Sequence, residues 1–172
     1  MATTTTISQV GEFPLISSMV GDLTMGQAVT LGPGDDGAVF QVDGSAVVST
    51  DVLVEEVHFR RRWSTATDVG RKAVAVNVSD IEAMGAVPVA LVVGFSAPGD
   101  LPASWAREFM AGMTAESQKA GVSVVGGDTT GGPVVSIAVT VIGQTAGMAP
   151  VRRDGAVPGD EVAVIGQLGL AA

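Results

Sequence analysis

Oxygen-bearing side chains gather between residues 47 and 59. Two hydroxyls, three carboxylates and the chain's only histidine fall within ten positions there: Ser49, Thr50, Asp51, Glu55, Glu56 and His58. Val47 and Val48 precede them and predict the end of a buried strand, which would place Asp51 on the rim of a sheet. Such oxygens suit a hard cation like Mg2+, which binds carboxylates, water and substrate phosphates. The alternative for this stretch alone is a surface turn with solvated acids.

Acidic residues recur at three other places in the chain. Asp35 and Asp36 lie in the glycine-rich turn 32–37, and Asp128 follows Gly126 and Gly127 at the end of a predicted strand, residues 122–125. Asp43-Gly44 is typical of a hairpin turn joining strands 38–42 and 46–49, which would bring the Asp35 pair alongside Asp51.

Asp80 is the fourth acidic position. A helix is predicted from Thr67-Asp68, where the acid suits the positive helix end, to a stop at Gly85 and Pro88. On that helix one row contains Val69, Ala73, Val76, Asp80 and Met84. A carboxylate that faces inward must be paired or bound to a metal. Rotation of the helix, which would leave Asp80 in solvent, is the alternative. We expect the four acidic positions to converge on one site.

The remaining elements frame these positions. Helices are predicted at residues 8–20, beginning near Phe13 because of Pro14, and at 102–120, which ends at Gly121. Strands are predicted at 89–95, 134–142 and 162–165. The last seven residues indicate a glycine-rich turn that enters a helix. We therefore expect an N-terminal domain over residues 1–150, a linker with the start of a second domain over 151–172, and a larger parent protein.

The composition narrows the function classes. The net charge of −9 argues against nucleic acid and against an anionic membrane surface as partners. Without cysteine, the 172 residues offer no disulfide, thiolate nucleophile or zinc thiolate. Neither a signal peptide nor an apolar run of membrane-spanning length is recognisable, so we expect a cytoplasmic protein. The 47% hydrophobic and 16% charged residues fit a tightly packed α/β or α+β chain.

A chain this acidic needs cations to hold a polyanionic ligand. No Walker A pattern is present, so phosphate would be held through metal ions. Several Mg2+ ions that bridge phosphate oxygens supply most of what phosphoryl transfer requires. A metal-dependent phosphatase or a calcium-binding module would use the same residue types, although the EF-hand spacing is absent.

Four motifs, in this order, resemble the thiamine-monophosphate kinase family, within the superfamily of aminoimidazole ribonucleotide synthetase, the hydrogenase maturation protein HypE and selenophosphate synthetase. They are Gly-Pro-Gly-Asp-Asp-Gly-Ala-Val at 32–39, Ser-Thr-Asp-Val-Leu-Val-Glu-Glu-Val-His-Phe at 49–59, Ala-Val-Asn-Val-Ser-Asp-Ile-Glu-Ala-Met-Gly-Ala at 75–86 and Gly-Gly-Asp-Thr-Thr at 126–130. Ser-Thr-Asp followed by His-Phe favours the kinase over its relatives.

The resemblance implies ATP-dependent phosphorylation of thiamine monophosphate to thiamine diphosphate, by direct in-line transfer with several Mg2+ ions. It implies metal binding by six residues: Asp36, Ser49, Thr50, Asp51, Asp80 and Asp128. Gly127, Asp128 and Arg153 would contact ATP, and His58 would face the thiamine phosphate. It identifies no catalytic side chain. A lone histidine is more often structural, and Arg153 read locally is equally a solvated loop residue.

The implied fold is an α+β domain with a mixed sheet, helices on one face, and sheet pairing between two copies in a homodimer. Glu56 stands where the family commonly has glycine, which predicts an altered loop around His58. The family's C-terminal half, which supplies further ligands, is not in these 172 residues, so we expect weak turnover at best. Another ATP-dependent synthetase or maturation enzyme of the superfamily, or a non-catalytic dimerisation fragment, remains an alternative.

Overall fold

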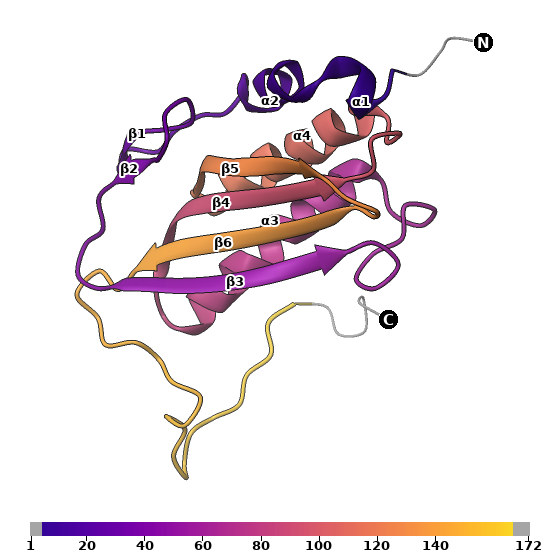
Figure 1. Ribbon diagram of the computed structural model, residues 1–172. Coiled ribbons are helices and arrows are strands. Elements are labelled where there is room, and N and C mark those ends of the chain that lie inside the picture. Colours follow the sequence, from indigo (N-terminus) through magenta and orange to yellow (C-terminus); the bar gives the residue numbers. More distant parts are fainter. Residues whose placement is uncertain (1–4, 167–172) are drawn as a thin grey trace.

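The computed structural model describes residues 5–166 as an α+β fold (Figure 1). Its elements, in chain order, are α1 (Ile7–Val10), α2 (Glu12–Val20), β1 (Val29–Leu31), β2 (Val39–Phe40), β3 (Ala46–Val54), α3 (Ala66–Ala83), β4 (Val87–Ala97), α4 (Ala103–Ala120), β5 (Ser123–Gly131) and β6 (Ser136–Gln144). The predicted helices and most predicted strands are present within a few residues.

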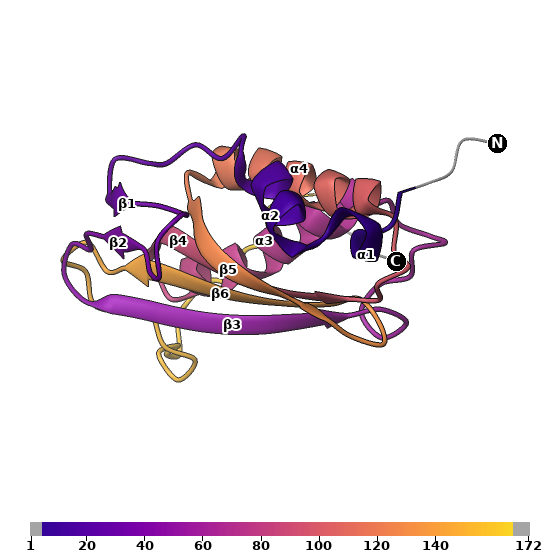
Figure 2. The same cartoon turned by 45° about the horizontal axis from the view of Figure 1, so that its top comes forward.

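The main sheet has four strands in the order β3-β6-β4-β5. β6 pairs antiparallel with both β3 and β4, whereas β4 and β5 are parallel and joined through α4. Within residues 5–166 the helices lie on one side of this sheet, and none of them covers its other face (Figure 2). We call that other side the open face. The expected mixed sheet with helices on one face is therefore confirmed.

Helices α3 and α4 pack closely because two glycines face each other across the contact. A Cβ atom on Gly70 would lie 2.1 Å from the carbonyl oxygen of Phe109, and one on Gly112 would lie 2.2 Å from that of Thr67. No larger residue fits at either position. The helix ends are fixed by ordinary signals: Thr65 caps α3 together with Asp68, and Gly121 ends α4 in the left-handed conformation.

The core lies between the sheet and the helices. Its largest fully buried side chains include Phe109, Leu15, Ile81, Leu91, Leu101 and Met113. Phe59, Phe95, Trp105 and Phe109 form a chain of stacked rings that joins the start of α4 to the sheet. The aromatic residues of the predicted helix 102–120 are thus packing residues, and they fix the end of the sheet near Phe59.

The N-terminal helix predicted within residues 8–20, beginning near Phe13, is present as α2, which begins at Glu12. Gly11, with φ 83°, separates it from the short α1, which was not predicted. Pro14 lies in the first turn of α2, where its missing N–H costs no hydrogen bond.

The predicted hairpin through Asp43-Gly44 is wrong. β2 pairs with β1, and β3 pairs with β6 along nine residues, from Ala46–Gln144 to Val54–Ser136. The glycine turn exists, with Gly44 at φ 77°, but it packs against residues 145–147. The local turn signal was correct, whereas the pairing depended on a strand ninety residues away.

Two acids that were predicted at strand ends lie within strands. Asp51 is in the middle of β3, and Asp128 is in β5, which continues to Gly131. A further strand predicted at 162–165 does not form, since these residues are exposed and irregular.

Candidate functional site

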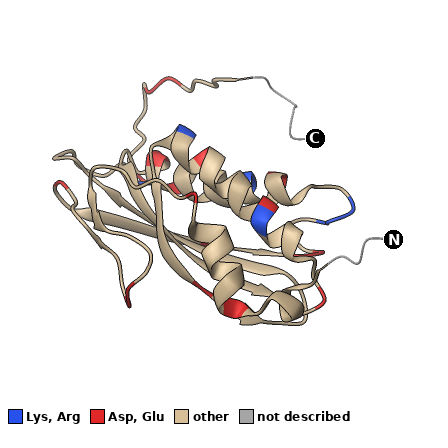
Figure 3. Ribbon diagram, turned by 90° about the horizontal axis from the view of Figure 1, so that it is seen from above, with Lys and Arg blue, Asp and Glu red and all other residues tan. Residues whose placement is uncertain are grey.

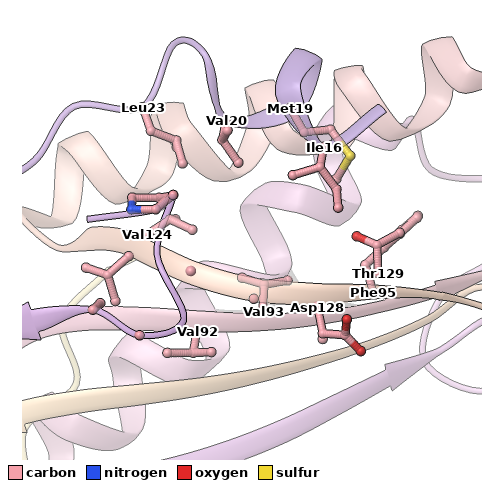
Figure 4. A pocket seen from close by; sticks show the side chains of 18 of the residues that line it. Ile16, Met19, Val20, Leu23, Val92, Val93, Phe95, Val124, Asp128 and Thr129 are labelled. Atoms are coloured by element: carbon pink, nitrogen blue, oxygen red, sulfur yellow. The ribbon is translucent and has the colours of Figure 1, made fainter. Parts of the chain in front are cut away.

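A pocket of about 610 Å³ lies between α2, the loop 33–38, β4 and β5 (Figure 4). One side is apolar, with Ile16, Met19, Val20 and Leu23 from α2 and the residues just after it, and Val124 from β5. Asp35 and Asp36 from the loop and Asp128 from β5 line the same pocket. A hydrophobic wall next to exposed carboxylates suits a ligand with a flat apolar part and a metal-bound anionic part.

Local structure places the acids at this pocket. The Asp35 carboxylate accepts the Asp36 N–H at 2.9 Å, which fixes the turn that bears both acids. Gly127 has a packing reason for being glycine, because a Cβ atom there would lie 2.1 Å from the carbonyl oxygen of Val93. This close approach holds β5 against β4 at the residue before Asp128. The structure thus brings together the predicted residues Asp36, Gly127 and Asp128.

A second group forms between β3 and α3. The Ser49 hydroxyl donates to the Asp80 carboxylate at 2.8 Å, and the Asp51 N–H donates to the side-chain oxygen of Asn77 at 3.2 Å. Ser49 and Asp51 alternate with Thr50 along the strand, so these two side chains are on the helix side of the sheet. The structure therefore joins three further predicted residues, Ser49, Asp51 and Asp80, into one polar edge.

Asp80 reaches this edge differently from its prediction. It is exposed, whereas the buried row of α3 contains Val69, Ala73, Val74, Asn77, Val78 and Ile81. The predicted inward row was rotated by about one position. Because the Asp80 carboxylate is exposed, it can bind a metal at this edge but does not require one to offset burial.

Asn77 is the residue whose importance sequence reasoning missed. Its side chain is 1% exposed, donates to the Ala73 carbonyl at 2.9 Å and accepts the Asp51 N–H. This amide ties the free edge of β3 to α3 at the position of Asp51. The signal in the sequence was an amide on the same helix face as Ala73 and Val74.

The predicted convergence of all the acids does not occur within one chain. Across the sheet, Asp51 pairs with Val139, Val139 with Val93, and Val93 with Gly127. Three strand spacings correspond to about 14 Å. Asp128 follows Gly127 and therefore points to the open face, opposite to Asp51. Figure 3 accordingly shows acidic residues spread over strands, loops and helices.

Within residues 5–166, no three His, Cys, Asp or Glu side chains are close enough together to hold a metal ion by themselves. Thr50 belongs to neither acidic group. Its hydroxyl meets that of Thr140 on the open face, beside the exposed Val48 and Val52.

His58 and Arg153 lie apart from both groups. His58 is in the loop after β3, where its Nδ1 accepts the Val54 N–H at 3.0 Å and Lys72 donates to its carbonyl oxygen. Arg153 is exposed in the segment after β6, which runs along the helix side (Figure 3). That segment is tied to the end of α3 by the bond from the Val151 N–H to the Met84 carbonyl. Neither residue lines the pocket with Asp128.

One carboxyl group has a clearly shifted pKa. The hydroxyl of Thr65, and then its N–H, hold the pKa of Asp68 below its ordinary value of 3.8. The hydroxyl donates to Asp68 at 2.7 Å and the N–H at 3.1 Å. Asp68 thus serves the start of α3, next to the loop of His58.

Residues 34–145 match the family described as AIR synthase related protein, N-terminal domain. The match covers more than half of the chain, including both acidic groups and His58. The chain belongs to this family. The resemblance found from the four motifs is therefore confirmed.

Several proteins that are similar to this chain are named thiamine-monophosphate kinase. The thiamine-monophosphate kinase of Mycobacterium tuberculosis is 48% identical over 97% of this chain and 50% of its own length. A crystal structure of the Aquifex aeolicus thiamine monophosphate kinase has a TM-score of 0.62 at 36% identity, over 65% of this chain and 37% of that one.

A further structure, AaThiL complexed with AMPPCP and TMP, has a TM-score of 0.56 at 28% identity, over 83% of this chain and 44% of that one. This chain spans about half the length of the curated relatives it matches.

The donor chemistry of this family member fits Mg2+. In nucleotide sites Mg2+ is usually held by one or two carboxylates, together with water and substrate phosphates, rather than by a complete protein cage. Asp36 and Asp128 at the pocket offer two carboxylates, and Asp51 with Asp80 offers two more beside the Ser49 hydroxyl. Each group can therefore hold a phosphate-bridged ion without a third protein carboxylate.

Proposed function

We propose that this chain is the ATP- and Mg2+-binding half of an enzyme that phosphorylates thiamine monophosphate to thiamine diphosphate. The observation that carries this proposal is the pocket in which an apolar wall adjoins Asp36 and Asp128. The names of the similar proteins, and the AMPPCP and TMP bound by one of them, supply the substrates.

ATP fits the pocket because the pocket has an apolar wall for the base and carboxylates for metal-bound phosphates. The base would contact the apolar residues of α2 and Val124, and the phosphates would extend along Gly127 toward Asp128. A triphosphate and a chain with net charge −9 repel each other unless cations lie between them. Mg2+ on Asp36 and Asp128 would supply those cations.

The second group would serve the transferred phosphoryl group. Ser49, Asp51 and Asp80 would hold a further Mg2+ ion on the helix side, and His58 would contact the phosphate of thiamine monophosphate. Thr50 would bind metal from the open face. When bound, Mg2+ neutralises charge on the phosphates and aligns the attacking and leaving oxygens. The protein's own work is to hold these oxygens and rings in place.

A second copy of the chain would bring residues of two open faces into one interface. Val48, Val52 and Val92 are exposed on the open face by 62%, 45% and 39%. Thr50 and Asp128 lie on this same face, so pairing two open faces in a homodimer would set them against the partner. Light scattering should then give twice the mass of one chain, and a mass of one chain would contradict the homodimer.

Among residues 5–166, no helix combines the length and hydrophobicity needed to span a bilayer. Because ATP is abundant in the cytoplasm and the sequence has no cysteine, we place the enzyme there.

The function is tested by incubating the full-length protein with ATP, Mg2+ and thiamine monophosphate and by measuring thiamine diphosphate. We expect product that depends on all three. ATP consumption on a different substrate, with no thiamine diphosphate formed, would favour another synthetase or maturation enzyme of the superfamily. Dimerisation without either activity would identify a non-catalytic assembly module.

A further inference from the structure

The loop between β3 and α3 contains His58, and backbone hydrogen bonds fix the loop on both sides of this residue. The His58 N–H donates to the Val54 carbonyl at 2.8 Å, and the Glu56 N–H donates to the Phe59 carbonyl at the same distance. Since the His58 Nδ1 accepts the Val54 N–H, a neutral ring has its proton on Nε2. The loop therefore presents an N–H donor that suits a phosphate oxygen.

Glu56 holds an unfavourable backbone conformation in this loop. Its φ is 66°, in the left-handed region that glycine adopts without strain and other residues avoid. The backbone at Glu56 thus takes the conformation that a glycine would adopt, and a glutamate stays there only if its side chain is held.

Two arginines hold the Glu56 side chain. Arg60 Nε lies 3.1 Å from one carboxylate oxygen and Arg62 Nη1 lies 2.8 Å from the other. Both guanidinium groups also lie over the Trp63 ring, at 4.2 and 5.2 Å from its centroid. Trp63 is 71% exposed, so its ring mainly serves as a platform for the two arginines. We call Glu56, Arg60 and Arg62 the Glu56 clamp.

We propose that the Glu56 clamp is a positioning device that sets the affinity for the acceptor substrate by fixing the loop of His58. This inference rests on the proposed function, in which His58 contacts thiamine monophosphate. The clamp residues act through the loop. The pocket that would receive ATP lies on β4, β5 and α2, so the clamp is separate from it.

The test compares variants of the full-length protein. Glu56→Gln removes the charge, Glu56→Gly removes the side chain but accepts φ 66° without strain, and Arg62→Ala removes one of the two ion pairs. Arg62→Lys is the conservative rescue. Lys119→Ala is the control, because it breaks an ion pair between the exposed Lys119 and Glu116 on α4, far from the loop.

We expect Glu56→Gln and Arg62→Ala to raise the KM for thiamine monophosphate about three- to tenfold, while the KM for ATP stays within about twofold. Glu56→Gly should change the KM for thiamine monophosphate less, because glycine adopts φ 66° without the clamp. The Kd for thiamine monophosphate without ATP, measured by calorimetry, should rise by the same factor. Arg62→Lys should recover most of the loss, and Lys119→Ala should match the wild type.

Three results would overturn the clamp. If the variants are active and their KM and Kd for thiamine monophosphate equal those of the wild type, the clamp does not position the loop, and the proposed function is unaffected. Equal rises in both KM values would show a general structural effect. A wild-type protein that forms no thiamine diphosphate would remove the proposed function and the clamp together.

Discussion

Asn77 joins the polar edge of the sheet at β3 to helix α3. Its amide is buried and makes two hydrogen bonds, one within α3 and one to the N–H of Asp51. A buried polar group of this kind is costly to leave without its partner. The position of Asp51 therefore depends on a residue that binds no ligand.

We predict that Asn77→Ala lowers the free energy of unfolding by about 1–3 kcal/mol, because the Asp51 N–H loses its acceptor. Ser79→Ala is the control on the same helix: Ser79 is exposed and bonds only to the Val76 carbonyl. Its effect should stay within about 0.5 kcal/mol. Urea unfolding measures both, and equal small effects would contradict the role of Asn77.

The residues that line the site could be predicted from the sequence better than their burial and their contacts. Asp36, Gly127 and Asp128 were predicted as partners, and they do line one pocket. Asn77 was missed and Asp80 was placed too far inward, since a helix row that is off by one position exchanges the buried and exposed faces. Periodicity alone does not fix this rotation. The contact of α3 with β3 and α4 does.

At the scale of elements, α3 depends on its cap at Thr65 and on the contact of Gly70 with α4. The start of the helix was predicted within two residues, at Thr67-Asp68, because its signal is local, whereas the contact with α4 was not predicted. The pairing of β3 with β6 was not predictable in this way, because the Asp43-Gly44 signal is local and the partner strand is distant. The turn at Asp43-Gly44 forms, but β3 pairs with the distant β6 and not with the strand before the turn.

We predict that Gly70→Ala destabilises the chain by about 1–3 kcal/mol, because the new Cβ would overlap the Phe109 carbonyl. Helix propensity by itself predicts the opposite sign, a gain of about 1 kcal/mol. Ala75→Gly, at an exposed position of α3, gives the propensity term alone. A higher melting temperature for Gly70→Ala would show that α3 and α4 do not approach this closely.

The cap of α3 makes stability depend on pH. The folded-state pKa of Asp68 is lowered by Thr65, so the ionised carboxylate favours the folded state. This contribution is fully present above the ordinary value of 3.8 and is lost as the pH falls through the folded-state pKa.

We therefore predict that Asp68→Asn lowers the melting temperature at about pH 7 and that the difference from wild type shrinks by about pH 3. Thermal unfolding at the two pH values checks this. A difference that does not change with pH would indicate that Asp68 is not ionised in its cap.

At the scale of the whole molecule, two polar groups lie on opposite faces of one sheet. In the proposed function, the pocket with Asp36 and Asp128 would hold Mg2+-ATP, and the edge with Ser49, Asp51 and Asp80 would hold further Mg2+ ions. We propose that a second chain packs on the open face, beside Thr50 and Asp128. The sequence motifs contain the residues of both groups. The distance between the two groups in one chain follows from the strand order, which the motifs do not determine.

The most direct test is isothermal titration of the full-length protein with a non-hydrolysable ATP analogue and Mg2+. Asp128→Asn and Asp51→Asn are compared with Glu116→Gln, which removes the same unit of charge from an ion pair on α4. We predict that both aspartate variants bind about tenfold more weakly or worse when Mg2+ is present, a loss of about 1.4 kcal/mol, while Glu116→Gln binds like the wild type. If Asp51→Asn also bound like the wild type, the two acidic groups would not serve one Mg2+-ATP complex, and the account would be contradicted.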